Sequence, residues 1–287
     1  MKRKSKLVAA AIAIIGFSTA ASITGTVAWF TANNIVAATG MNIQAEAEEG
    51  IVIAQELASY TDASWKTNVT AAHSGSGLEK GFIPTSTSTA AAWYHGNSES
   101  ADTHEAGTGD NAVQAISVAT PTLVSGNGVG TATVNGIEGR NVYLLNHFYV
   151  QSTVPGTGIL NQDLEIKNVT AQDSSTDEKA LALDKSLRVL FKLGSTVKIY
   201  APLLETDFAA TSYAGAAEYV NGDDATPDVL LSNSTIPGYV ANSVSSALDI
   251  SVYIYFEGED TNCKSANIGT FANIAISFKL GNKTHSA

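Results

Sequence analysis

Residues 187–200 read LRVLFKLGSTVKIY, and this stretch decides the fold class. β-Branched, aliphatic and aromatic residues fill both halves, and the turn formers Gly194-Ser195-Thr196 separate them. Two such runs joined by a short connection that contains glycine predict a β-hairpin. We therefore expect an antiparallel sheet in the middle of the chain.

Similar runs lie on both sides of this hairpin. Residues 142–150 predict one long strand, and residues 248–256 and 274–280 predict the last two strands. Shorter candidates, each flanked by turn formers, are 41–46, 51–53, 112–119, 131–134 and 164–169. About ten short strands of this kind predict an all-β fold, an antiparallel β-sandwich of jelly-roll type. Helix formers at 177–185 and 208–220 predict one or two short helices.

Two segments differ from these runs in composition. Residues 61–110 are rich in Ser, Thr, Gly, Ala and His, and residues 206–234 are similar. We interpret both as exposed loop insertions in a single domain that spans residues 39–287. Trp65, Trp93 and Tyr94 lie in the first insertion, where flat rings can stack on sugars, although such rings more often pack a loop onto a sheet.

The charge balance is acidic. The chain has 16 Lys and Arg against 27 Asp and Glu, a net charge of −11. This balance argues against a nucleic-acid partner, because phosphate binding needs clustered basic side chains. Cys263 is the one cysteine, so the chain cannot form an internal disulfide. We expect a buried, inert thiol rather than a cross-link between subunits.

The N-terminus has the layout of an export signal. Lys2, Arg3, Lys4 and Lys6 precede an apolar run from Leu7 to Phe17, and small residues follow as far as Ala28. The apolar run is shorter than the roughly 20 residues that a membrane-spanning helix needs. The pattern predicts a signal peptide over residues 1–28, cut between Ala28 and Trp29, and a secreted protein at the cell surface. A cut after Ala20 and an uncleaved membrane anchor are the alternatives.

The residues around this cut, Gly25-Thr26-Val27-Ala28-Trp29-Phe30-Thr31, resemble the processing junction of the TasA/camelysin family of exported fibre and biofilm-matrix proteins. Two more stretches resemble that family, the strand pair 186–202 and the closing strands 255–278. Residues 61–110 depart from its smaller members. The resemblance implies a jelly-roll subunit of an extracellular filament or biofilm-matrix fibre, with copies of itself as partners and other matrix or surface components as further candidates.

The resemblance also implies how such a fibre assembles. The mature N-terminus, residues 29–38, would act as a donor strand that fills a groove in the next copy. Trp29, Phe30, Ile35 and Val36 are too apolar for a solvated tail. The simpler reading is that residues 29–38 form the first strand of their own sheet. A different function, a monomeric surface adhesin that binds glycans through residues 61–110, is the alternative to the filament.

Catalytic patterns are not evident in the sequence. Zinc hydrolases need about three His or carboxylate ligands and a general base, but no two of His73, His95, His104, His147 and His285 are four residues apart. We interpret them as solvated loop histidines and predict no enzyme and no cofactor. Calcium is the candidate metal, since it binds several oxygen ligands and loop carboxylates can supply them. The weak candidates are the loop carboxylates Asp223, Asp224, Glu257 and Asp260, which by default are solvated surface charges.

Overall fold

The computed structural model describes part of the chain. The described residues are 42–47, 51–55, 61, 64–72, 82–95, 114–124, 126–134, 136–155, 164–173, 186–201, 219–221, 229–231, 238–240, 243–244, 247–258 and 271–280. Within these ranges the chain is nearly all β-strand and contains no α-helix. The predicted all-β class is therefore confirmed. The jelly-roll type stays a prediction.

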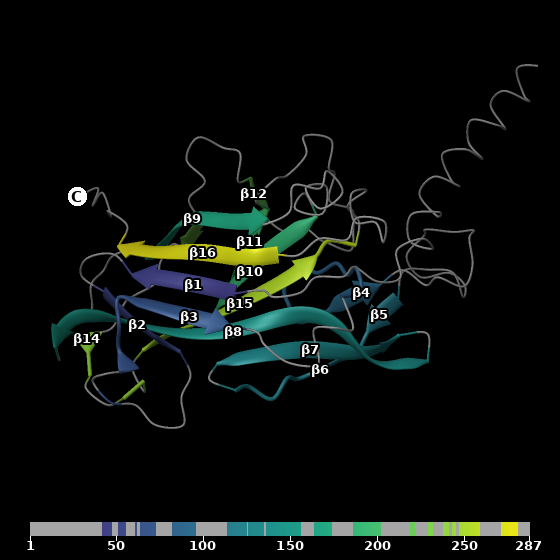
Figure 1. Ribbon diagram of the computed structural model, residues 1–287, viewed down its shortest axis with the longest axis horizontal. Coiled ribbons are helices and arrows are strands. Elements are labelled where there is room, and N and C mark those ends of the chain that lie inside the picture. Colours follow the sequence, from purple (N-terminus) through teal and green to yellow (C-terminus); the bar gives the residue numbers. More distant parts are fainter. Residues whose placement is uncertain are drawn as a thin grey trace, which may run out of the picture.

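The larger sheet has nine strands (Figure 1). Their order is β12-β11-β10-β15-β8-β7-β6, and β14 and β2 also pair with β8. The bounds are β2 Ile51–Gln55, β6 Val118–Ala119, β7 Asn127–Val134, β8 Ile137–Pro155, β10 Leu187–Leu193, β11 Thr196–Ala201, β12 Tyr219–Asn221, β14 Gly238–Tyr239 and β15 Leu248–Phe256.

A five-stranded sheet forms a second layer, with the order β13-β9-β16-β1-β3. Its strands are β1 Asn42–Ala47, β3 Asn68–Ala72, β9 Leu164–Asp173, β13 Val229–Leu231 and β16 Phe271–Leu280. A separate pair joins β4 Trp93–His95 to β5 Gln114–Ile116. Most pairs are antiparallel, but β1–β16, β11–β12 and β14–β8 are parallel.

Strand β8 is the spine of the larger sheet. On one side, its residues 144–150 pair with β15. On the other side, β7 pairs along residues 137–146 and β2 along residues 148–152. A long strand can pair with two neighbours on the same side in this way, because each neighbour forms its backbone hydrogen bonds with a different part of the strand.

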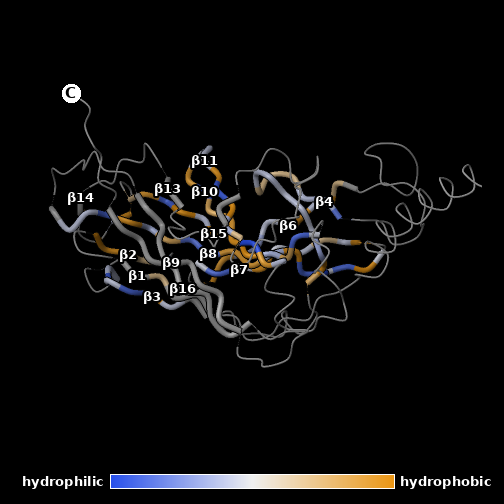
Figure 2. Tube along the Cα trace, turned by 90° about the horizontal axis from the view of Figure 1, so that it is seen from above, coloured by the Kyte–Doolittle hydropathy of each residue, from blue (hydrophilic) through white to orange (hydrophobic). Residues whose placement is uncertain are grey.

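The inner face of this sheet is fully buried. Alternate residues of three neighbouring strands point to it, as the period of two in a strand requires. They have no exposed surface: Leu144, Phe148 and Val150 of β8, Ile250, Val252, Ile254 and Phe256 of β15, and Leu187, Val189 and Phe191 of β10. The five-stranded sheet overlies these strands in Figure 1, and Figure 2 shows hydrophobic stretches along β10 and β15. Ala45 of β1 and Val69 of β3 are buried from the opposite side.

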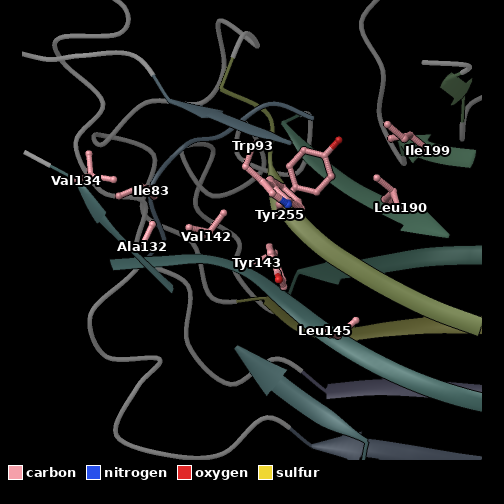
Figure 3. Packing of buried hydrophobic residues seen from close by; sticks show 10 residues of the cluster. All are labelled: Ile83, Trp93, Ala132, Val134, Val142, Tyr143, Leu145, Leu190, Ile199 and Tyr255. Carbon is pink, nitrogen blue, oxygen red and sulfur yellow. The ribbon is translucent and has the colours of Figure 1, made fainter. Parts of the chain in front are cut away.

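The outer face of the same strands is also apolar. Tyr143, Leu145, Leu190, Ile199 and Tyr255 form a second buried cluster there (Figure 3). Residues 82–95, which we call the covering segment, supply Ile83 and Trp93 to this cluster. The central strands are thus buried on both sides, which needs a third layer outside the two sheets.

Several predicted elements match the structure. Residues 187–200 form the β10–β11 hairpin, in which Leu193 pairs with Thr196 and Gly194 adopts a φ of 57°. The long strand predicted at 142–150 lies within β8. The last two strands are present as β15 and β16, but they do not pair with each other, because they lie in different sheets. Of the two helices, 177–185 lies outside the described residues, and 208–220 is described only at Tyr219 and Val220, which are in β12.

The expectation of an exposed insertion at 61–110 is wrong for most residues described there. Phe82 has no exposed surface, and Ile83, Thr85, Ser86 and Trp93 are at most 3% exposed. The sequence also missed β3 and β4 within this range. β3 consists of Asn, Val, Thr and Ala, and β4 has only three residues, so neither gives a clear hydrophobic period. The remaining part of 61–110, and most of 206–234, lie outside the described residues.

Gly130 in β7 gives a test of the packing on the outer face. A Cβ atom at this position would lie 2.6 Å from the Cε1 and Cε2 atoms of Tyr143. We expect Gly130→Ala to lower the free energy of unfolding by about 1–3 kcal/mol, because the tyrosine ring has to move within a packed cluster. Thr133→Ala, at an exposed position of the same strand, is the matched control. Equal denaturation midpoints for both variants would contradict the packing described here.

Candidate functional site

The covering segment docks on the larger sheet through its backbone. The Ile83 amide donates to the Asn141 carbonyl (2.9 Å), and the Thr85 amide donates to the Phe256 carbonyl (3.0 Å). The Gly258 amide donates in return to the Thr85 carbonyl (3.0 Å). A Cβ atom at Gly258 would lie 3.2 Å from the Thr85 nitrogen. Glycine therefore permits the close approach of the two backbones.

A tight turn in this segment sets the position of Trp93. The Ala90 amide donates to Thr87 Oγ1 (3.0 Å), and Trp93 Nε1 donates to the Ala90 carbonyl (3.2 Å). Thr87 Oγ1 donates onward to the Ala92 carbonyl (2.7 Å). Ala90 has a φ of 59°, the one described non-glycine residue with a positive φ. This conformation costs a residue with a Cβ atom about 1–2 kcal/mol, so the surrounding hydrogen bonds hold a strained turn in place.

Four aromatic rings meet next to this turn. Trp93 stacks on Tyr143 with ring centroids 4.7 Å apart and meets Tyr255 edge-on at 5.1 Å. Tyr143 in turn meets Tyr253 edge-on at 5.0 Å. Figure 3 shows Trp93 among the side chains of β8 and β15. Stacked and edge-to-face pairs at these separations stabilise a cluster beyond the area they bury.

A pocket of about 440 Å³ opens beside these rings, on the outer face of the larger sheet. Trp93, Tyr143, Leu145 and Tyr253 line its inner part, and the first three are 3–6% exposed. Exposed residues line its mouth, among them Ala91, Ser117 and Thr120. The pocket therefore has an aromatic floor and a polar rim.

The tyrosines of the pocket stay protonated over the physiological range. Burial raises the pKa of Tyr143 to about 12, and the neighbouring Tyr253 adds to this rise. Burial also raises the pKa of Tyr253, with a smaller rise from Asp249 and an opposing effect from its hydrogen bond with Ser251. A neutral phenol both donates and accepts a hydrogen bond.

One imidazole reaches the pocket. His147 lies in the middle of β8, opposite Ser251 of β15. Its Nε2 atom is 3.1 Å from Ser251 Oγ, and the residue lines the pocket. The interpretation of the histidines as loop residues is therefore wrong for His147, which is in a strand and half-buried.

A second polar group is sealed under the covering segment. Ser86 Oγ donates a hydrogen bond to Glu257 Oε1, and neither residue is more than 2% exposed. The Glu257 amide donates to the Ser186 carbonyl (2.8 Å), which puts Arg188 on the same sheet face at the diagonal position. Arg188 is fully buried, and its Nη1 atom donates to the Leu187 carbonyl (3.0 Å). Buried charges of this kind are stable only with hydrogen-bond partners.

His95 is another buried polar residue of the covering segment. It is 4% exposed, and its Nδ1 atom is 2.7 Å from the Pro84 carbonyl oxygen. Because a carbonyl only accepts, Nδ1 carries the proton. Burial lowers the pKa of His95, the Pro84 hydrogen bond opposes this shift, and the charge of Arg140 adds to it. The expectation of a solvated loop is therefore wrong for His95 too. His73, His104 and His285 lie outside the described residues.

The structure describes few of the site residues that the sequence predicts. Ala28, Trp29, Phe30, Ile35 and Val36 lie outside the described residues, as do Asp223, Asp224, Asp260 and Cys263. Glu257 is described, and it is a buried, hydrogen-bonded carboxylate rather than the solvated surface charge expected by default. The described residues bring no three His, Cys, Asp or Glu side chains together as a metal site. The calcium hypothesis stays a prediction.

The aromatic residues of 61–110 also differ from expectation. Trp65 and Trp93 are 7% and 3% exposed, and Tyr94 is half-buried. The alternative that such rings pack a loop onto the sheet holds for Trp93. The sequence did not indicate the pocket, but one signal was present. Both alternating sets of residues in 142–145 are apolar or aromatic, which indicates a strand covered on both faces.

Comparison with known proteins gives no relative, since no family model, curated protein or solved structure matches this chain. Among the residues that the structure describes, no helix has the length and apolar character needed to cross a membrane.

The buried His95 predicts acid sensitivity. Because folding lowers the pKa of His95, the unfolded chain takes up a proton at this histidine at a higher pH than the folded protein does. The free energy of unfolding is therefore unaffected by this group above pH 6.5 and decreases as the pH falls below that value. We expect the decline to reach at most about 1.4 kcal/mol for each pH unit below that value. Denaturant unfolding between pH 7.5 and about pH 5 measures it.

His95→Asn keeps an N–H donor near the Pro84 carbonyl but cannot titrate. We expect this variant to be less stable at neutral pH and to show a flatter decline with acid. His147→Gln is the matched control, because it removes an imidazole from β8 of the larger sheet and lies outside the covering segment. An unchanged acid slope in His95→Asn would show that another group controls the sensitivity.

Proposed function

We propose that this chain is a structural subunit of a secreted extracellular filament, assembled without covalent links by exchange of its mature N-terminal strand. The export signal and the apolar residues Trp29, Phe30, Ile35 and Val36 are the basis of the proposal. The all-β fold supports it, because sheet edges bind an added strand through backbone hydrogen bonds.

The observation that carries the proposal is the position of β1. This strand begins at Asn42, only three residues after the proposed donor, and it pairs with β16 on one side and β3 on the other. The proposed donor is therefore joined to a paired strand by a connection of three residues. Strand addition to a second copy requires a donor that is covalently attached to a folded sheet in this way.

The described edge strands support strand addition as well. β6 has two residues beside the eight of β7, and β12 has three beside the six of β11. Within the described residues, these short strands cover only part of the edge behind them. Backbone groups on such an edge accept another strand. This account needs no catalytic residue.

A monomeric surface adhesin is the second candidate function. The aromatic pocket favours it, because Trp93 comes from the segment that was expected to bind glycans. Electron microscopy of the purified protein separates the two candidates, since the adhesin forms no long polymers.

Deletion of residues 29–38 tests the filament directly. We expect protein prepared from residue 39 onward to fold with the same β-sheet circular dichroism but to remain monomeric by size-exclusion chromatography. Protein prepared from Trp29 should form fibres in negatively stained images. The matched control keeps the apolar residues and replaces Thr31, Asn33 and Asn34 with serine, and it should still polymerise. Long fibres from the deleted protein would refute the donor assignment.

A further inference from the structure

We propose that the pocket beside Trp93 is a binding site for a neutral sugar ring. This inference does not depend on the filament, because the pocket is complete within one chain. It differs from the glycan hypothesis drawn from the sequence, since two of the three aromatic residues that line the pocket, Tyr143 and Tyr253, come from β8 and β15 and not from residues 61–110.

The size and layout of the pocket fit one or two sugar rings. Its volume of about 440 Å³ lies in the range of small-molecule sites in proteins. Tyr143, Leu145 and Tyr253 come from two paired strands, and Trp93 is held by the turn at Ala90. A floor built from strands and a hydrogen-bonded turn is formed before the ligand arrives, which reduces the entropy cost of binding.

The chemistry of the lining matches a ring with one apolar face and several hydroxyls. Aromatic side chains supply flat apolar surface. The lining also contains polar residues, namely the phenols Tyr143 and Tyr253, the imidazole His147 and the exposed Ser117 and Thr120. All five groups exchange hydrogen bonds with hydroxyls. A ligand with several hydroxyls can therefore form more hydrogen bonds with this lining than an entirely apolar ligand can.

The charge of the site indicates a neutral ligand. None of the described residues that line the pocket is Asp, Glu, Lys or Arg. The charge of Asp249 contributes to the raised pKa of Tyr253, and a negative charge of this kind disfavours an anionic ligand. The chain as a whole is also acidic, with a net charge of −11. A sugar acid should therefore bind more weakly than the corresponding neutral sugar.

The strained turn is the second observation behind the proposal. Ala90 lines the pocket and has a φ of 59°. Unfavourable backbone conformations of this kind concentrate at ligand sites. The turn at Ala90 also orients a pocket residue, because the Ala90 carbonyl accepts a hydrogen bond from Trp93 Nε1 at 3.2 Å.

Calorimetric titration of the purified protein tests the proposal. The probes are glucose, galactose, mannose, N-acetylglucosamine, glucuronic acid and a β-linked glucose tetrasaccharide. We expect at least one neutral sugar to bind, and glucuronic acid to bind more weakly than glucose or not at all. A tetrasaccharide that binds while the monosaccharides do not would place the ligand in a glycan chain and still support the site.

Variants connect the binding to this pocket. Ser117→Trp places a large ring at the exposed mouth and should abolish binding while the fold is retained. Tyr253→Phe removes one hydroxyl and should weaken binding by about 3- to 10-fold. Tyr149→Phe is the matched control, because Tyr149 lies farther along the same face of β8 and does not line the pocket. It should leave affinity unchanged.

Two results would overturn the inference. One is failure of every neutral probe to bind a protein whose circular dichroism and cooperative unfolding are intact. The other is sugar binding that Ser117→Trp leaves unaltered, since the sugar would then occupy another place.

Discussion

Burial on both faces of β8, β10 and β15 is the constraint on which the rest of this structure depends. Val142, Leu144 and Leu145 are all at most 6% exposed, although successive residues of a strand point to opposite sides. An ordinary two-layer sandwich would leave one of these sides in water. The five-stranded sheet buries the inner side, and residues 82–95 bury part of the outer side.

That outer cover explains the unusual polar interior. The covering segment brings Ser86 against Glu257, and within the segment His95 is hydrogen-bonded to the Pro84 carbonyl. Each polar atom named here has a hydrogen-bond partner, as burial requires. The segment does not fill the outer face evenly. Beside its turn at Ala90, a pocket lined by Tyr143 and Tyr253 remains. The site and the stability of the central sheet therefore share one cause.

The sequence predicted the elements that have a simple hydrophobic period. Residues 187–200 and 248–256 alternate or run apolar between turn formers, and they form β10, β11 and β15. It did not predict which strands pair, because pairing between distant strands leaves no local pattern, and β15 and β16 are in different sheets. It also placed 61–110 at the surface, since Ser, Thr and Ala dominate that composition. The described apolar residues in it that are buried are Trp65, Val69, Phe82, Ile83 and Trp93, and their spacing is too irregular to give a periodic signal. The proposed donor strand rests on residues that the structure does not describe.

Hydrogen exchange measured by mass spectrometry tests the central claim most directly, namely that residues 82–95 are a structural layer and not an exposed loop. The amides of Ile83, Thr85, Ser86 and Tyr94 donate to backbone carbonyls at 2.9–3.0 Å, so they should exchange as slowly as those of β15. Exchange of these four amides at the rate of an unstructured peptide, while β8 and β15 stay protected, would contradict the account.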